Sequence, residues 1–121
     1  KMLRSVMIKG LEALTAEMGL AAERAGVTTE VIDSLNASFP SVDWGAWTSY
    51  NLERMATHGV RRAEEMEEVV KTLEDLGIEP DVTEATVRRQ RRFGESDVVL
   101  DSGSPDLQER SRIILSTMKI I

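Results

Sequence analysis

The sequence of 121 residues contains no cysteine and only one histidine, His58. These absences exclude a disulfide framework, a thiolate metal site and a histidine-rich metal site. No apolar run approaches the roughly 18 residues that a membrane-spanning helix needs, and no secretory signal is visible. We therefore expect no bound metal, no membrane contact and a cytoplasmic location.

Basic charge is scarce as well. Fifteen Lys and Arg residues stand against 21 Asp and Glu residues, which gives a net charge of −6. The charges of both signs are well mixed along the chain, and this argues against electrostatic binding to nucleic acid.

Aromatic residues make up only 4% of the chain. Trp44, Trp47 and Tyr50 recur at three-residue spacing, so they are expected to form one ridge on a helix. Such clustering in an aromatic-poor chain indicates a major packing site, either in the core or at a dimer interface.

Apolar residues recur with helical period, and no segment alternates as a strand would. The sequence predicts a single all-α domain over residues 1–121, a bundle of about six helices around a long central N-terminal helix. Gly59 marks either a break between helices or a tight helix contact. The predicted helices include residues 1–25, 44–58 and 60–76, and a last one starts at Ser104-Pro105. A short helix capped by Thr28 or Thr29 ends at Phe39-Pro40, and another, capped by Asp81 or Thr83, ends at Phe93-Gly94.

Further predictions concern burial and the segment before the last helix. The buried stripe of residues 60–76 includes Leu76, and residues 95–104 are predicted as a loop or short extended segment. The last helix is expected to bury Ile113, and its end, Ile120-Ile121, to dock on the core or on a second subunit.

The first predicted helix is apolar nearly all round, which is typical of a central helix. Its broad apolar face comprises Leu3, Met7, Ile8, Leu11, Leu14, Met18, Ala21, Ala22 and Ala25, extended on one side by Met2, Val6, Ala13 and Leu20. A narrow polar stripe remains, formed by Lys1, Ser5, Lys9, Glu12 and Glu23. An ammonium group beside such a face needs a partner, an exit to solvent or a function.

The stripe opens with the segment KMLRS, Lys1 to Ser5. It resembles the K-x-x-x-N motif of the second domain of β-hydroxyacid dehydrogenases, with Ser5 where the family usually has Asn. Two later segments, KGLEAL from Lys9 and HGVRRAEEM from His58, resemble a 6-phosphogluconate-dehydrogenase-like subgroup whose C-terminal domain long had no assigned function. The resemblance covers roughly residues 1–95, and the three segments in order are more specific than the first alone.

This resemblance implies the C-terminal substrate-binding and dimerisation domain of an NAD(P)-dependent oxidoreductase. The expected substrate is a small β-hydroxyacid or a related alcohol, and the expected assembly is a homodimer. No glycine-rich dinucleotide fingerprint follows a strand in this sequence. A Rossmann domain that binds NAD or NADP is therefore expected upstream, and the 121-residue domain alone is not expected to be active.

The resemblance also implies roles for individual residues. Lys1 would exchange a proton with the substrate hydroxyl, and Ser5 would hold either the Lys1 ammonium or a substrate oxygen. The chemistry requires a lysine that gives up its proton near neutral pH, which crowding by other cations favours. Arg4 and Lys9 lie within two turns of Lys1 and are assigned to substrate binding.

Glu12 departs from the pattern of true 6-phosphogluconate dehydrogenases. In those enzymes a glutamate two turns beyond the motif lysine assists decarboxylation as an acid, but here Ile8 occupies that offset. Glu12 lies about 16 Å along the helix axis from Lys1, too far for one proton-transfer site. Glu12 is therefore interpreted as a partner of Lys9, and the departure counts against 6-phosphogluconate decarboxylation.

His58, Arg61 and Arg62 form a second basic cluster. By resemblance, a basic residue of this region lies beside the cofactor or the acid group of the substrate, and the arginine fork suits a carboxylate. The alternative is a histidine at a helix junction with solvated arginines. His58 and Arg61 are retained as substrate-binding candidates, whereas solvation is favoured for Arg62.

Two charged runs have simpler interpretations. Four arginines within residues 88–92 suit a phosphate, but cations near a helix C-terminus also suit the helix dipole, and we favour the latter. The glutamates of residues 64–68 with Lys71 form a solvated face with one i,i+4 pair. For the whole chain, the alternative to a dehydrogenase domain is a non-catalytic helical interaction module whose polar stripe pairs internally.

Overall fold

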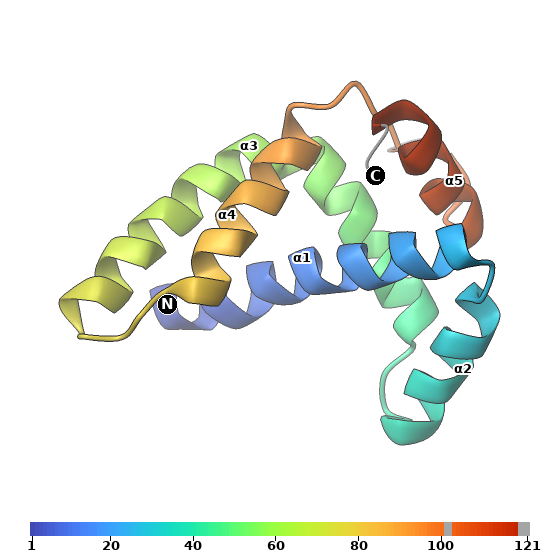
Figure 1. Ribbon diagram of the computed structural model, residues 1–121, viewed down its shortest axis with the longest axis horizontal. Helices are drawn as coiled ribbons and strands as arrows, with labels where there is room; N and C mark the ends of the chain where they lie inside the picture. Colours follow the sequence, from blue (N-terminus) through green and yellow to red (C-terminus); the bar gives the residue numbers. More distant parts are fainter. Residues whose placement is uncertain (101–102, 119–121) are drawn as a thin grey trace.

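The computed structural model describes residues 1–100 and 103–118, and all the regular secondary structure within them is helical. Its helices are α1 (Met2–Ala25), α2 (Thr28–Ser38), α3 (Trp44–Asp75), α4 (Asp81–Gly94) and α5 (Leu107–Met118) (Figure 1). The predicted all-α class is confirmed. The described residues form five helices instead of about six.

The helix count differs because residues 44–58 and 60–76, predicted as two helices, belong to one. Helical structure continues through Gly59, although Figure 1 shows that α3 changes direction near its middle. Here α3 meets α4 backbone to backbone, since a Cβ atom on Gly59 would lie 2.7 Å from the backbone N of Gly94. Of the two alternatives for Gly59, the tight helix contact is confirmed and the break is wrong.

Local capping signals explain several helix ends. Gly26 ends α1 with φ of 74°, and the N–H of Val27 donates to the carbonyl of Ala22 at 2.9 Å. Asp43 caps α3 by accepting a hydrogen bond from the N–H of Ala46 at 3.1 Å. The caps predicted for α2 and α4 are wrong, because no side chain caps either helix at its start.

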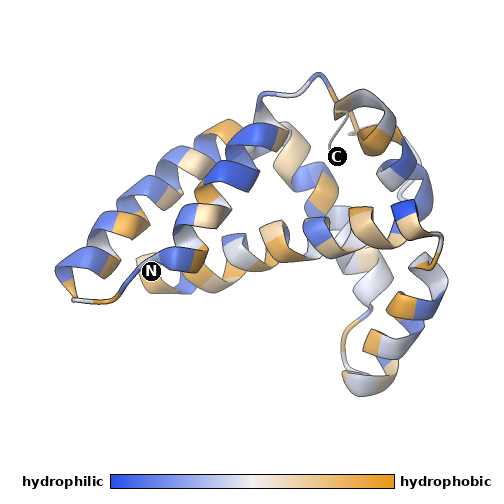
Figure 2. Ribbon diagram, viewed as in Figure 1, coloured by the Kyte–Doolittle hydropathy of each residue, from blue (hydrophilic) through white to orange (hydrophobic). Residues whose placement is uncertain are grey.

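The inward side of α1 is not the broad apolar face predicted from the sequence. Leu3, Met7 and Leu14 of that face are 55%, 60% and 61% exposed, and hydrophobic residues, coloured orange, recur along the ribbon of α1 in Figure 2. The helix still contacts all four of the others. Its buried residues are mostly small, and they allow close packing: Glu12, Ala13, Thr15, Ala16, Gly19, Leu20 and Ala22.

The main core lies where α1, α3 and α5 meet the end of α4. Its largest fully buried apolar side chains are Leu52, Met55, Phe93 and Ile114. Residues 95–104 were predicted as a loop or short extended segment, and two of their side chains, Val98 and Leu100, complete this core.

A second, smaller core joins the later half of α3 to α4. It contains Ala63, Met66, Val69 and Val87, with Val6 of α1 packed against it. These residues confirm most of the predicted buried stripe on residues 60–76.

Some expected core positions are not buried. Leu76 is 60% exposed and Ile113 is 37% exposed, so both predictions of burial are wrong. Ile120 and Ile121, which were expected to dock on the core or on a second subunit, lie outside the described residues.

The aromatic ridge lies at the edge of the molecule. The Trp44 and Trp47 rings lie 5.3 Å apart between centroids, and Phe39 meets Trp44 edge-on at 5.9 Å. Tyr50 is 55% exposed, with the Arg54 guanidinium 5.6 Å from its ring centroid. None of these rings belongs to either core, so the predicted packing of the ridge in the core is wrong. Its packing at a dimer interface stays a prediction.

Candidate functional site

The predicted catalytic stripe occupies the first turns of α1. Lys1, Ser5 and Lys9 succeed one another at intervals of four residues, which places them on one side of the helix. Lys1 and Arg4 are exposed, while Ser5 and Lys9 are half-buried. Within the described residues, the side chains of these four residues make no hydrogen bond or ion pair, so their polar atoms are available to a ligand.

Side-chain contacts between α1 and α3 show which residues of α3 lie at the same height along the axis of α1. The Asn51 amide donates to the Thr15 hydroxyl at 2.9 Å, and further along α3 the Thr72 hydroxyl approaches the sulfur of Met2 at 3.3 Å. The ion pair of Arg62 with Glu12 falls between these two contacts.

This order places His58 and Arg61 beside the middle of α1. The Glu12 level lies about 16 Å along the axis from Lys1. The structure thus groups Lys1, Arg4 and Ser5 at one end of α1. Lys9 lies about 12 Å further along the axis, where Gln90 contacts both its carbonyl and Glu12, so it lies near the level of His58 and Arg61.

Glu12 is the centre of a buried polar network. It is 4% exposed, and its carboxylate accepts hydrogen bonds from Arg62 and, at 2.9 Å, from the Gln90 amide. Gln90 also donates to the main-chain carbonyl of Lys9 at 3.3 Å. The predicted partnership of Glu12 with the Lys9 side chain is therefore wrong, and so is a solvated Arg62.

Gln90 is the network residue that sequence analysis missed. It is fully buried, although it stands inside the arginine run. A signal was present, because Thr83, Thr86, Val87 and Gln90 recur at intervals of three and four residues and form the buried face of α4. The network ties α1, α3 and α4 together at one level.

Replacing Arg62 by methionine, which keeps an apolar stem, should lower the free energy of unfolding by about 3 kcal/mol. The substitution leaves a buried carboxylate without its cation, and breaking such pairs typically costs this much. Urea unfolding followed by circular dichroism measures the loss. The adjacent Arg61→Met is the matched control; Arg61 is exposed, and a change above about 0.5 kcal/mol there would show that the effect is not specific to the buried pair.

His58 lies in a cationic part of α3. Burial lowers the pKa of His58, and the charges of Arg54, Arg61 and Arg62 lower it further. The ring is therefore neutral at pH 7, and the exposed Arg61 beside it carries the charge that a substrate acid group would meet.

Glu53 lies in the same segment of α3 as His58. Burial alone would raise its pKa, but hydrogen bonds from Thr57 and Arg54, each 2.7 Å long, and the charges of Arg54 and Arg110 lower the pKa overall. A carboxylate stabilised in this way stays ionised in the folded protein.

The lowered pKa of Glu53 makes a pH-dependent contribution to stability. This contribution is present above the pKa of the unfolded chain and is lost as the pH falls through the lower pKa of the folded state. Glu53→Gln should therefore lower stability at pH 7 and have a smaller effect at pH 3. Thermal unfolding of both proteins at the two pH values tests this, and equal effects at both would contradict it.

The described ranges, 1–100 and 103–118, offer little to a metal or a dinucleotide. They contain no group of three His, Asp or Glu residues placed to hold a metal ion. They also contain no strand that a glycine-rich phosphate loop would follow. In the same ranges, no helix combines the length and the apolar character needed to cross a bilayer.

These features define an all-helical domain in which α3 meets α4 backbone to backbone. Unpaired polar side chains at the start of α1 give it a candidate ligand site at one end. The model of a domain of unknown function, DUF1932, matches residues 22–93. The chain belongs to this family.

Comparison with solved structures shows the same fold in a longer protein. A conserved hypothetical protein from Sinorhizobium meliloti 1021 is similar with a TM-score of 0.79 and 35% sequence identity. The match covers 93% of this chain and 39% of that one, so this chain spans well under half the length of that protein. No curated protein matches the chain.

Proposed function

We propose that the chain is the C-terminal substrate-binding and dimerisation domain of an NAD(P)-dependent oxidoreductase that acts on a small β-hydroxyacid or a related alcohol. The observation that carries the proposal is the set of unpaired polar side chains at the start of α1, on the helix whose sequence resembles the dehydrogenase motif. DUF1932 domains are typically found with NAD(P)-binding dehydrogenase domains, which supports the same class.

In this proposal the chain supplies the groups that bind the substrate and move its proton. NAD(P)+ would be held mainly by residues outside this sequence and would supply the acceptor for the hydride of the carbinol carbon. Lys1 takes the proton of the substrate hydroxyl and returns it in the reverse direction. Ser5 orients the Lys1 amine or a substrate oxygen, and Arg4 binds the substrate carboxylate. Lys9 lies about 12 Å along the axis from Lys1, so it binds the end of the substrate remote from the hydroxyl.

His58 and Arg61 have a separate place in the proposal. At the level of Glu12 they lie about 16 Å along the axis from Lys1, so they do not join the proton-transfer step. Arg61 is exposed and charged, which suits contact with the end of the substrate remote from its hydroxyl.

The exposed apolar side chains of α1 are the proposed dimer face. Leu3, Met7 and Leu14 form one stripe on the helix, and each is more than half exposed. Such a stripe suits a second copy of the chain, because two-fold association pairs the same surface of both subunits. Met7→Glu should therefore convert a dimer to a monomer in sedimentation analysis of the full-length protein.

The proposed activity is tested with the full-length protein, NAD+ or NADP+ and a series of short β-hydroxyacids and alcohols. Reduction of the nicotinamide, followed by absorbance, is expected with at least one of them, and residues 1–121 alone should give none. Binding of neither nucleotide would contradict the proposal. A protein that also forms dimers would then fit the alternative of a non-catalytic interaction module.

A further inference from the structure

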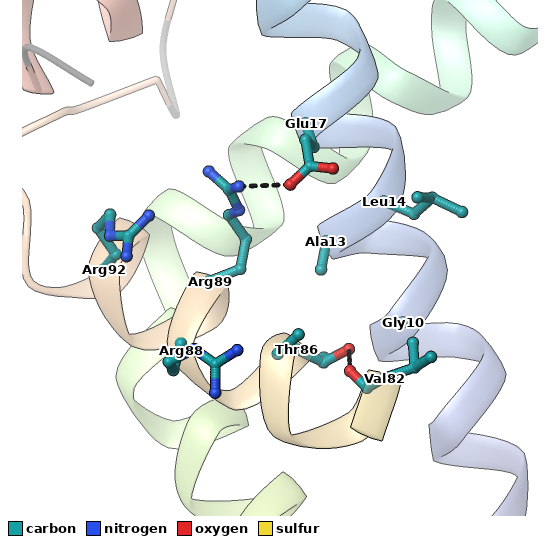
Figure 3. Close-up of a pocket in the computed structure, with 10 residues that line it drawn as sticks. Gly10, Ala13, Leu14, Glu17, Val82, Thr86, Arg88, Arg89 and Arg92 are labelled. Atoms are coloured by element: carbon teal, nitrogen blue, oxygen red, sulfur yellow. Dashed lines mark hydrogen bonds and ion pairs between the residues drawn. The ribbon is translucent and has the colours of Figure 1, made fainter. Parts of the chain in front are cut away.

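A groove runs between α1 and α4, beyond the turns that carry Lys1 and Ser5. Its volume is about 220 Å³. Val82 of α4 and Gly10 of α1 line one end, and the ion pair of Arg89 with Glu17, whose atoms lie 2.6 Å apart, lies at the other (Figure 3).

The four arginines of α4 differ in whether they form an ion pair. Arg89 pairs with Glu17 of α1, and Arg91 pairs with Glu67 of α3 at 3.1 Å. Arg88 and Arg92 have no ion-pair partner within the described residues, both are exposed, and both line the groove. Since the Arg89–Glu17 pair is neutral as a whole, these two guanidinium groups leave the groove with excess positive charge in a chain whose net charge is −6.

The two free arginines are spaced to act on one group. They are four residues apart on α4, which puts their Cβ atoms about 6 Å from each other on one side of the helix. Guanidinium forks at that spacing are able to approach a single oxyanion from two directions with charge-assisted hydrogen bonds. The helix dipole accounts for cations near the C-terminus of α4 but not for the place of two unpaired ones in the lining of a groove.

Most of the rest of the groove lining is apolar, and it also includes the buried Thr86. Ala13 and Leu14 line it from α1, while Val82 and Ala85 line it from α4. Val82 is 72% exposed, so its side chain is accessible to a ligand in the groove. The groove shares only Leu14 with the proposed dimer stripe.

We propose that this groove binds a small organic anion, in which a phosphate or carboxylate group lies between Arg88 and Arg92 and a short apolar substituent lies against Val82. The volume corresponds to about seven water molecules and falls below the range of about 300 to 1,000 Å³ that holds drug-sized ligands. A ligand with one ring or a short alkyl chain fits this space.

Phenyl phosphate, inorganic phosphate and benzoate are the probes, titrated into the full-length protein by calorimetry at low salt without nucleotide. Phenyl phosphate is expected to bind at least fivefold more tightly than inorganic phosphate, because only the former has an apolar group. Benzoate binding as tight as that of phenyl phosphate would assign the site to carboxylates, and weaker benzoate binding to phosphates. Equal affinity for phenyl phosphate and inorganic phosphate would overturn the proposal, as would no binding of any probe.

Substitutions place the probe in the groove. Arg88→Ala and Arg92→Ala should each weaken phenyl phosphate binding at least fivefold, and Val82→Ser should weaken it without changing the affinity for inorganic phosphate. Arg91→Ala removes the same charge from the side of α4 that faces Glu67 and should change the affinity less than twofold. If Arg91→Ala weakens binding as much as Arg88→Ala and Arg92→Ala, only diffuse charge attracts the anion, and the groove is not its site.

Discussion

Gly59→Ala should destabilise the fold by about 3 kcal/mol or more, at or above the upper end of the usual range for overpacking. The new Cβ would overlap the carbonyl oxygen of Gln90 and lie 2.7 Å from the backbone N of Gly94. These atoms belong to the backbone of α4 and cannot rotate away, so α3 and α4 would have to separate. Both cores would be disturbed, because Phe93 belongs to one and Val87 to the other. Chemical unfolding of the two proteins gives the difference.

A second glycine in a helix provides the matched control for this prediction. A Cβ on Gly10 would meet its nearest neighbour, the Thr86 hydroxyl, at 3.9 Å. Gly10→Ala should therefore stabilise the protein by up to about 1 kcal/mol, the usual gain in helix propensity. Gly94→Ala should repeat the loss seen for Gly59→Ala, since its Cβ would lie 2.7 Å from the carbonyl carbon of Gly59. A Gly59→Ala protein within 1 kcal/mol of the parent would show that the two backbones do not touch.

The helices were largely predictable because their signals are local. Gly26 and Asp43 act on residues within one turn of themselves, so the sequence around them is enough to place an end of α1 and the start of α3. Gly59 was ambiguous for the opposite reason. What distinguishes a tight contact from a break is Gly94, a residue of another helix whose approach no local pattern reveals.

The buried face of α1 was not predictable from its own composition. A nearly all-apolar helix has several faces that are able to pack, and the neighbours decide which one does. Here close approach to Thr48 favours Gly19, where a Cβ would lie only 3.0 Å from the Thr48 methyl group. The larger side chains of Met7 and Leu14 were left outside.

The residues of the candidate site also differ in how far the sequence predicts their positions. The spacing of Lys1, Ser5 and Lys9 is a property of one helix, so the sequence was enough to place them on one side of it. The partners of Glu12 come from α3 and α4, and within its own helix only Lys9 was visible as a cation at pairing distance. Arg62 and Gln90 became partners through the packing of three helices.

In the full-length protein, Lys1→Ala should reduce turnover of the hydroxyacid substrate by about 10²- to 10⁴-fold, the usual contribution of a general acid or base. The fold should be unaffected, because Lys1 is exposed and its side chain makes no hydrogen bond or ion pair within the described part of the chain. Steady-state kinetics give the loss, and the unfolding midpoint shows whether the variant is intact.

Lys1→Arg separates proton transfer from simple attraction of the substrate. Arginine keeps the positive charge but does not release its proton in proteins, so substrate should still bind while turnover stays as low as in Lys1→Ala. Lys71→Ala is the matched control, because Lys71 is an exposed lysine whose 3.0 Å ion pair with Glu68 lies at the surface. Turnover in Lys1→Ala above one tenth of the parent value would remove Lys1 from the proton-transfer step. Recovery of turnover in Lys1→Arg would instead limit its role to charge, since the one property that the two cations do not share is the ability to give up a proton near neutral pH.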